Sequence, residues 1–405
     1  MYKLEQKLYC NGRWKDGAES VSPEREEKAM LSRRQFVTAG TVGLGTLAVG
    51  GVAGVAAWDG STRPRDPAGA WAESSGVNRI LLAATLAASS HNTQPWRFRA
   101  TPDAIELLGD AKRTMGAADP RLREMHVSLG CALANMELAA AGEGMATRFE
   151  FVPGPRNGHH ARLALLPSEK PARAPEPLAE AIPHRRTNRG PYAAKQAVPL
   201  ELLGKLGEFV GEGLRVVWLT TPEQRAAFTR LTVDATAAHV ADATMQRDSH
   251  RWYRMRRTDA EQRRDGITVG GANLAFPASL VLGLMPPTPD SFDEGWAKAT
   301  EETHCGTAPA FGLIVAERGG DHRAWLETGR AYGRMQLSAT IAGIATHPLS
   351  QALAVRDREV SAGTPDAFAS GLEKLAGPGE VVLAFRLGYP EREQQPSLRR
   401  VPMSA

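Results

Sequence analysis

The chain has 405 residues, enough for two domains or one large fused unit. Hydrophobic residues make up 42% and charged residues 23%, a balance typical of a globular protein with a substantial core. The formal net charge of +4 is small for this length and gives no global signal for nucleic-acid binding. The three cysteines, Cys10, Cys131 and Cys305, have no metal-ligand spacing, which argues against a structural zinc site or a disulfide framework.

The N-terminal region has the layout of a twin-arginine export signal. Residues 30–58 read MLSRRQFVTAGTVGLGTLAVGGVAGVAAW, in which Arg33 and Arg34 precede Phe36 and a weakly apolar run rich in Gly and Ala. A buried helix is the alternative, but each glycine would cost it about 1 kcal/mol relative to alanine. We therefore expect export by the twin-arginine translocation machinery to the periplasm or cell envelope, with a membrane tether through residues 37–57 if the signal is not cleaved.

Residues 1–29 do not fit such a signal, because a signal should begin near its arginines. They contain YCNGRWKDG, which predicts a strand and a turn. Met30 is therefore a candidate translation start, and residues 1–29 are treated as an extension whose role the sequence leaves open. Residues 59–70, DGSTRPRDPAGA, have the composition of a linker.

Residues 71–175 predict helices alternating with short strands. A helix is expected over residues 71–88, and a hairpin over WRFRATPDAIELL, where apolar and polar residues alternate on both sides of a Thr-Pro-Asp turn. A second helix should run from Pro120 to a glycine stop at Gly142 or Gly144. TRFEFVPG and HHARLALLP predict two more strands, with His159 and His160 in an exposed turn. The Pro- and Ala-rich stretch 168–183 is the best domain boundary in the chain.

Residues 176–405 form the second predicted unit. PLELLGKLGEFV predicts a helix, LRVVWLTT a strand, and the following residues a long helical region to about Arg264. AFGLIVAE predicts a buried strand, followed by a helix from Ala324 to about Ala342. THPLSQ, residues 346–351, predicts a loop, and GEVVLAFRLGYP a final strand.

An internal repeat relates the two units. With an offset of 199 residues, GCALANMELAAAGEGMAT (130–147) aligns with GRAYGRMQLSATIAGIAT (329–346), and eight of the eighteen positions are identical. Two unrelated Ala-rich helices are the alternative. The preferred interpretation is a fused pair of related halves whose small residues allow close helix packing.

Two polar segments carry candidate chemistry. SSHNTQPW, residues 89–96, offers hydroxyl, amide and backbone groups that can satisfy the polar edge of a flavin, or it is only a capped turn before a strand. RRTNR, residues 185–189, places three guanidinium groups and a hydroxyl together, which suits phosphate oxygens, or it is a solvated basic loop.

Together, SSHNTQPWRF, DPRLREMHVSLGCALANMELAA, PHRRTNRGPY and the RDSHRWYRMRR to DGIT region resemble the nitroreductase superfamily of FMN-dependent oxidoreductases. The likeness is closest to its long fused branch, the Acg-like FMN-binding proteins, and covers roughly residues 70–395. It implies an α+β, nitroreductase-like fold in which two related halves of one chain form a pseudo-dimer. In ordinary members two chains intertwine, with each FMN at their interface. Because each half here keeps one of the two motifs, the resemblance implies one FMN per chain between the halves and no required homo-oligomer.

The resemblance also implies roles for individual residues. The RRTNR segment corresponds to phosphate ligands, the SSHNTQPW segment to contacts with the ring or ribityl chain, and residues 348–351 to a loop near the reactive N5. That loop reads PLSQ here and lacks the acidic residue and glycine that are usual in the family. The implied cofactor-binding residues are Ser89, Ser90, Asn92, Gln94, Arg185, Thr187, Arg189, Pro348, Ser350, Gln351 and Arg399.

The implied activity is two-electron transfer through FMN between a small-molecule donor and acceptor, with no side-chain acid or base compelled by the sequence. The alternative is a protein that binds or sequesters FMN with little turnover, because export would separate it from cytoplasmic NAD(P)H. A cofactor-free structural protein would require both polar segments to be coincidences. The basic stretch 247–264 is interrupted by acidic residues, so we expect a solvated helix there and no nucleic-acid partner. The histidine spacing predicts no metal site.

Overall fold

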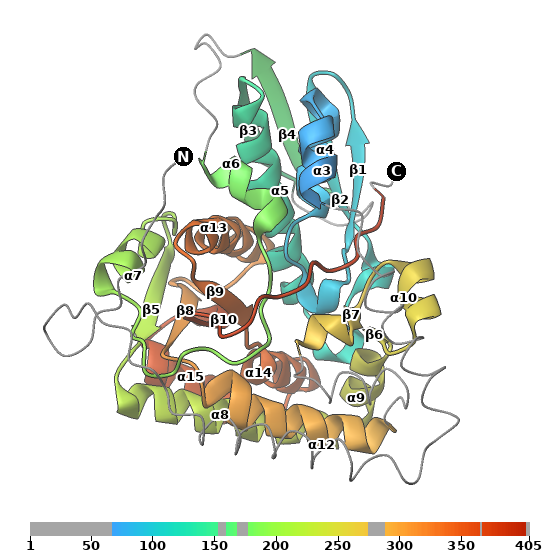
Figure 1. The fold of residues 1–405 in the computed structure, drawn as a ribbon. Helices are drawn as coiled ribbons and strands as arrows, with labels where there is room; N and C mark the ends of the chain where they lie inside the picture. Colours follow the sequence, from blue (N-terminus) through green and yellow to red (C-terminus); the bar gives the residue numbers. More distant parts are fainter. Residues whose placement is uncertain (1–66, 153–158, 168–176, 274–287, 365–366, 402–405) are drawn as a thin grey trace, which may run out of the picture. The chain divides into compact units, whose positions relative to one another are not determined.

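The computed structural model describes residues 67–152, 159–167, 177–273, 288–364 and 367–401. The predicted export signal, the N-terminal extension and most of the linker lie outside these ranges. The described part is α+β, as predicted: it contains two four-stranded antiparallel sheets, one two-residue parallel pair, and helices packed on the sheets (Figure 1). The predicted boundaries of the two halves stay a prediction.

The first sheet has the strand order β1-β2-β4-β3, with β1 at Trp96–Ala100, β2 at Ala104–Gly109, β3 at Met145–Phe151 and β4 at His159–Pro167. The predicted hairpin forms, and the Thr101 N–H closes its turn by donating to the Ala104 carbonyl at 2.8 Å. Half-buried and exposed residues alternate along β3, as expected for a sheet with one face exposed to solvent. Helix α5, Arg123–Gly142, packs on the sheet.

His160 departs from its predicted place in an exposed turn. It lies in β4, is 4% exposed, and packs edge-to-face on His126 with ring centroids 4.7 Å apart. Pairing of β4 with both β2 and β3 draws this residue into the core, an effect that the local Gly and Asn composition does not reveal.

The second sheet has the order β5-β8-β10-β9, with β5 at Leu214–Leu219, β8 at Ala310–Ala316, β9 at Ala345–Pro348 and β10 at Glu380–Gly388. All residues of β8 are buried, because α13 (His322–Ile341) packs against this sheet, and α14 (Gln351–Ala362) and α15 (Ala367–Ala376) pack against β10 (Figure 1). The prediction of a loop over residues 346–351 was wrong. Residues 345–348 pair with β10 as an edge strand that tolerates Pro348, and Gln351 begins α14.

The long helical region predicted up to Arg264 is broken. Asp242 ends one helix and caps the next, since its carboxylate accepts hydrogen bonds from the Thr244 and Met245 N–H groups. The stretch 247–264 is accordingly not a single solvated helix, and Trp252 and Arg254 are buried.

The predicted helix over 71–88 is likewise split, into α3 (Pro67–Glu73) and α4 (Gly76–Thr85).

No helix within the described ranges is long and apolar enough to cross a membrane. Besides α5, the described ranges contain the α-helices α3 (Pro67–Glu73), α4 (Gly76–Thr85), α6 (Pro177–Ala181), α7 (Leu200–Gly207), α8 (Pro222–Ala241), α9 (Ala243–His250), α10 (Arg257–Arg263), α12 (Pro289–Ala299), α13 (His322–Ile341), α14 (Gln351–Ala362) and α15 (Ala367–Ala376), and the π-helix η6 (Thr300–Cys305).

Helices α5 and α13 cross at two glycines. A Cβ on Gly130 would lie 2.0 Å from the Leu326 carbonyl oxygen, and a Cβ on Gly329 would lie 2.0 Å from the Val127 carbonyl oxygen. Gly130 and Gly329 are 199 residues apart, and so are Val127 and Leu326, so each helix offers the same positions to the other. Only glycine permits this backbone approach.

Substituting Gly130 with alanine should force the two helices apart and lower the free energy of unfolding by about 1–3 kcal/mol, the usual cost of overpacking. Gly204→Ala is the matched control, because Gly204 lies in a helix with open space around its missing Cβ. There alanine should be neutral or stabilising by up to about 1 kcal/mol. Chemical denaturation measures both variants, and equal stabilities would contradict the close crossing.

Candidate functional site

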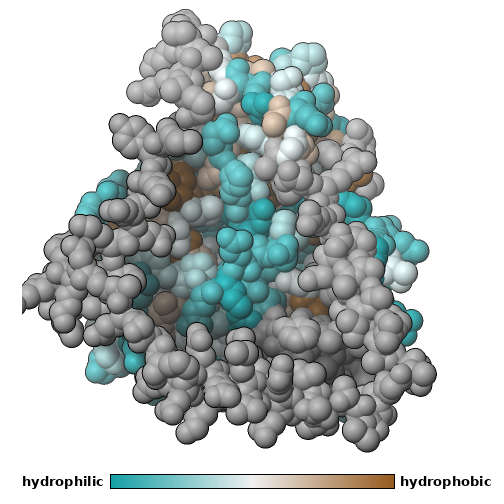
Figure 2. All heavy atoms as spheres, in the orientation of Figure 1, coloured by the Kyte–Doolittle hydropathy of each residue, from teal (hydrophilic) through white to brown (hydrophobic). Residues whose placement is uncertain are grey.

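A cavity of about 600 Å³ lies against α5 and is lined from both sequence halves. Its walls come from the turn 88–91, from α5, from the segment 187–191, from α12 with η6, and from the junction of β9 and α14. This volume is within the usual range for a small-molecule or cofactor site. In Figure 1 the segment after β10 crosses the front of the molecule toward β1, and Figure 2 shows that the described surface along this path is mainly hydrophilic.

The turn before β1 has an unusual backbone. His91, Asn92 and Gln94 have φ values of 46°, 55° and 50°, in the left-handed region that non-glycine residues seldom adopt. Two serine hydroxyls support it: Ser89 Oγ accepts from the Gln94 N–H, and Ser128 Oγ of α5 accepts from the Ser90 N–H, each at 3.1 Å. The turn places Ser89, Ser90 and His91 on the cavity wall.

Asn92 and Gln94 do not line the cavity. The Asn92 amide donates to the carbonyls of Gly266 and Leu398, both at 3.1 Å, and its oxygen accepts from Arg399. Gln94 is fully buried; its amide donates to the Arg264 carbonyl at 2.9 Å, and its oxygen accepts from the Arg400 N–H at 2.8 Å. In this structure both side chains hold the C-terminal segment and the turn after α10 against the site.

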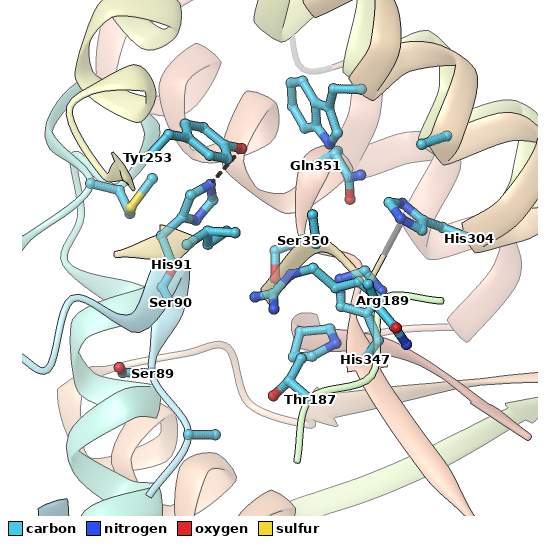
Figure 3. Close-up of a pocket in the computed structure, with 18 of the residues that line it drawn as sticks. Ser89, Ser90, His91, Thr187, Arg189, Tyr253, His304, His347, Ser350 and Gln351 are labelled. Atoms are coloured by element: carbon cyan, nitrogen blue, oxygen red, sulfur yellow. Dashed lines mark hydrogen bonds between the residues drawn. The ribbon is translucent and has the colours of Figure 1, made fainter. Parts of the chain in front are cut away.

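The segment 185–189 lies at one end of the cavity. Thr187 and Arg189 line it, and Figure 3 shows them beside His347, across from His91 and Tyr253. Arg185 is buried behind them and is not part of the lining. Its Nη2 donates to the Leu86 carbonyl at 3.2 Å, while its Nε is buried without a partner. Arg399 reaches the same Leu86 carbonyl at 3.4 Å, so guanidinium groups from residues 214 positions apart converge there.

The charges of these arginines are not compensated by carboxylates. Burial lowers the pKa of Arg185 to about 10, and the neighbouring Arg186 and Arg189 contribute to this shift. Burial also lowers the pKa of Arg399 well below its ordinary range, together with repulsion from Arg185, Arg186 and Arg189. Within the described part of the chain, no Asp or Glu is among the main charged groups that act on Arg185, Arg189 or Arg399. Uncompensated buried cations are costly, so this end of the cavity favours an anion.

The segment after β9 supplies further polar groups. Pro348, Ser350 and Gln351 line the cavity, whereas Leu349 is 1% exposed and packs in the core. The Ser350 hydroxyl is buried without a hydrogen-bond partner. A buried hydroxyl of this kind is usually satisfied by a ligand or an ordered water.

Four cavity-lining histidines were missed by the sequence interpretation: His91, His239, His304 and His347. Burial lowers the pKa of His91 to about 3 and that of His239 to about 4, and it also lowers the pKa values of His304 and His347. The imidazoles are therefore neutral near pH 7. Their sequence positions carry no common spacing, and in the described ranges no group of His, Cys, Asp and Glu side chains could hold a metal ion.

Two of these imidazoles present unsatisfied atoms. The Nδ1 atoms of His239 and His304 are buried without a partner. His91 is paired instead, since its Nε2 lies 3.4 Å from the Tyr253 hydroxyl (Figure 3). The cavity thus combines an end that favours an anion with neutral imidazoles on its walls, and the one acidic residue among its described lining residues, Glu124, is paired with Arg123.

Comparison with known proteins links most of the chain to nitroreductases. No protein-family model matches it. The chain is 25% identical over 313 residues to Rv3131 of Mycobacterium tuberculosis (strain ATCC 25618 / H37Rv), a protein provisionally named as an NAD(P)H nitroreductase; the match covers 77% of this chain and 85% of that protein. It is 33% identical over 118 residues to the acg protein of the same organism, also provisionally named as an NAD(P)H nitroreductase, covering 29% and 36% respectively.

Similar solved structures include the FMN-dependent nitroreductase NfnB of Mycobacterium smegmatis in complex with NADPH, at 16% identity and TM-score 0.31, covering 53% of this chain and 88% of that one. A nitroreductase of Anabaena variabilis gives 11% identity and TM-score 0.36, covering 71% and 69%. Because these TM-scores lie below 0.5, we draw no structural conclusion from them. The curated relatives support a relation of this chain to the nitroreductase superfamily.

The neutral histidines predict a loss of stability in mild acid. Their folded-state pKa values lie below the unfolded value of about 6.5, so the unfolded chain binds more protons and stability falls as the pH decreases from about 6.5 toward 4. Each such histidine contributes a loss of up to about 1.4 kcal/mol per pH unit. Chemical denaturation at several pH values should show that His239→Asn reduces this slope. Replacing the exposed His184 with Asn should not, and a wild-type stability that is flat across this range would contradict the prediction.

Proposed function

We propose that the protein is an FMN-dependent oxidoreductase of the nitroreductase type, which transfers two electrons through a single FMN bound between its two halves. The observation that carries this proposal is a group of desolvated guanidiniums at one end of a cavity of about 600 Å³: Arg189 lines the cavity, and Arg185 and Arg399 are buried outside its lining, with no acidic side chain of the described residues among the main charged groups that act on them. The dianionic phosphate of FMN would compensate these charges. The names of the curated relatives agree with this class of activity.

The same residues fit the parts of the cofactor. Arg189 and the Thr187 hydroxyl line the cavity and would donate to the phosphate, while the buried guanidiniums of Arg185 and Arg399 would add positive charge outside the lining. The flat ring would lie along the cavity wall, near the otherwise unpartnered hydroxyl of Ser350 and the Nδ1 of His304. When bound, FMN supplies the two-electron chemistry, and the protein supplies position and electrostatics.

The two halves are proposed to form a pseudo-dimer. Supporting this, α5 and α13 cross at positions that the 199-residue repeat aligns, and each helix places a glycine against the same backbone position of the other. The cavity is also lined from both halves, by Ser89 to His91 and α5 on one side and by Thr187, Arg189 and Ser350 on the other. A second chain is therefore not required to complete the site.

A single FMN is proposed because the equivalent place on α13 is occupied by ion pairs. Residues 128 and 131 of α5 line the cavity, and the positions 199 residues later are Glu327 and Arg330. Arg330 pairs with Glu327 and, at 2.7 Å, with Glu137, and its guanidinium lies 4.8 Å from the centre of the Phe149 ring. These groups neutralise one another and leave no uncompensated charge for a second phosphate.

The electron donor separates two versions of the proposal. NAD(P)H appears in the names of the curated relatives and is the first donor to test. The alternative is an FMN-binding or FMN-sequestering protein with little turnover, which the predicted export signal favours, because an exported protein would not meet cytoplasmic NAD(P)H. Stopped-flow mixing of the FMN-loaded protein with NAD(P)H, followed by a nitroaromatic or quinone acceptor, distinguishes them: rapid reduction and reoxidation support the enzyme.

The purified chain should carry, or acquire on incubation, the visible absorption bands of bound FMN. Arg185→Ala should weaken FMN binding at least tenfold, about 1.4 kcal/mol, because it removes a buried positive charge near the phosphate end of the cavity. Asn92→Ala should also weaken binding, because it releases Arg399.

Arg247→Ala is the matched control, since its side chain is 71% exposed and it lies outside the cavity lining. Fluorescence titration with FMN measures all three variants. A colourless protein that takes up no FMN would refute the flavin proposal. Normal binding by both Arg185→Ala and Asn92→Ala would refute the shared site.

Export by the twin-arginine machinery is proposed from Arg33, Arg34 and the apolar run after them. Replacing both arginines with lysine keeps the charge but removes the paired guanidiniums that define such signals. Expressed in a bacterial host with this pathway, the double variant should remain in the cytoplasmic fraction while the unaltered chain reaches the envelope or periplasm. Equal distribution of the two would contradict export by this route.

A further inference from the structure

Arg386 is a fully buried arginine in β10 whose charge has no carboxylate partner among the groups that bond to it. Its Nε donates to His347 Nδ1 at 3.1 Å. Its Nη1 donates to the carbonyls of Thr303 and His304 at 3.1 and 3.3 Å, and its Nη2 to those of Asn188 and Gly190 at 3.1 and 2.8 Å. All five N–H groups of the guanidinium therefore have acceptors.

These acceptors belong to three separate walls of the cavity. Residues 188–190 contain the proposed phosphate ligand Arg189, residues 303–304 belong to η6, and His347 lies in β9 directly opposite Arg386 in the strand register. The planar guanidinium of Arg386 also stacks on the Tyr192 ring, with 4.0 Å between the guanidinium carbon and the ring centre. One side chain thus ties together the segments that form the cavity.

The bond to His347 determines where the imidazole carries its proton. A guanidinium can only donate, so Nδ1 must accept and must be unprotonated. A neutral imidazole then has its single hydrogen on Nε2. His347 lines the cavity beside Pro348, and Figure 3 shows its ring next to Thr187 and Arg189.

We propose that Arg386 is a positioning residue that fixes His347 as an uncharged Nε2–H donor for an acceptor atom of the cavity ligand. The identity of that ligand as a flavin rests on the proposed function. The tautomer rests only on the chain's own geometry. The fixed donor makes ligand binding at this position insensitive to pH in the range where an ordinary histidine titrates.

The surroundings of His347 oppose an added proton. The titratable and charged groups that face it are Arg386 from β10, His304 from η6, Arg189 from the segment 185–190 and His91 from the turn before β1. None is acidic. Burial and these neighbours lower the pKa of His347 well below its usual value, which agrees with the neutral tautomer required by the hydrogen bond.

The first test uses the flavin-free chain and ¹⁵N-labelled histidine. The nitrogen resonances of His347, assigned by their loss in His347→Gln, should show an unprotonated Nδ1 and a protonated Nε2 that do not change between about pH 5.5 and 7.5. A protonated Nδ1, or titration of the ring in this range, would overturn the inference. No flavin is needed for this measurement.

The second test uses Arg386→Met, which removes the donors but keeps an unbranched apolar stem. His347 then loses the donor that imposes its tautomer, whereas burial, the largest cause of its lowered pKa, remains, so the ring should stay neutral and populate both tautomers. The ¹⁵N resonances of His347 should then show partial protonation of both ring nitrogens in place of a single protonated Nε2. FMN binding should weaken by about threefold, because the neutral ring no longer always carries Nε2–H.

A purely structural role for Arg386 would lower stability without changing the tautomer of His347, and that outcome would overturn the inference. If Arg386→Met does not fold, His347→Leu and His347→Gln test the same donor: the first should weaken FMN binding about tenfold and the second, which keeps an N–H donor, by less than about threefold. Equal affinities of the two variants would also overturn it. A fixed tautomer in a chain that binds no FMN would refute the flavin and leave the role of Arg386 intact.

Discussion

The contact between α5 and α13 at Gly130 and Gly329 is the constraint on which the site depends. At this crossing the missing side chains let the two helix backbones approach, with each glycine facing a carbonyl of the other helix. Val127, whose carbonyl faces Gly329, also lines the cavity, and so does Ser128, which supports the turn before β1. A change in helix separation would therefore move the cavity wall and the strained turn together. Packing and site geometry are coupled through one turn of α5.

The buried arginines show three ways of handling a charge away from water. Arg123 is fully buried and pairs with the equally buried Asp357 at 2.6 Å, which links the start of α5 to α14. Arg386 has no carboxylate but saturates its donors with four carbonyls and an imidazole. Arg185 has a buried Nε without a partner. A carboxylate compensates the charge of Arg123, although the Nη2 of this arginine is buried without a partner, and acceptors satisfy every donor of Arg386. Arg185 has neither a carboxylate nor a full set of acceptors among the described residues, and an anion with several oxygens matches that need.

Much of the fold could be predicted from the sequence because local patterns reflect it directly. The hairpin around Thr101 and Asp103, the strand at 310–316 and the helix ending near Gly142 form as periodicity and turn residues indicate. The strand at 345–348 could not be predicted in this way, because its four residues contain Pro348 and gain their conformation from pairing with β10. Tertiary pairing outweighs local propensity in such a short edge strand.

Only part of the site could be predicted from the sequence, because several of its residues come together only in the folded chain. Short motifs such as 185–189 keep their functional groups close along the chain, so Thr187 and Arg189 could be placed at a cavity wall. The histidines come from four different elements and meet only in the folded chain. Asn92 shows a further limit: its amide chemistry suits a ligand, but a left-handed φ of 55° turns it toward the C-terminal segment instead.

The proposed duplication gives a chemical reason for having one anion site rather than two. Position 137 on α5 aligns with position 336 on α13, and the residues there are Glu and Gln. The Glu137 carboxylate pairs with Arg330 and Arg334 at 2.7 and 2.6 Å, and Glu327 also pairs with Arg330, so two carboxylates compensate the two guanidiniums. The neutral Gln336 lies 3.5 Å from Arg185 and leaves its charge uncompensated. Because a buried cation without a counter-charge is costly to the fold, the amide at position 336 agrees with the proposed anion site, whereas the carboxylate at position 137 compensates its cations within the chain.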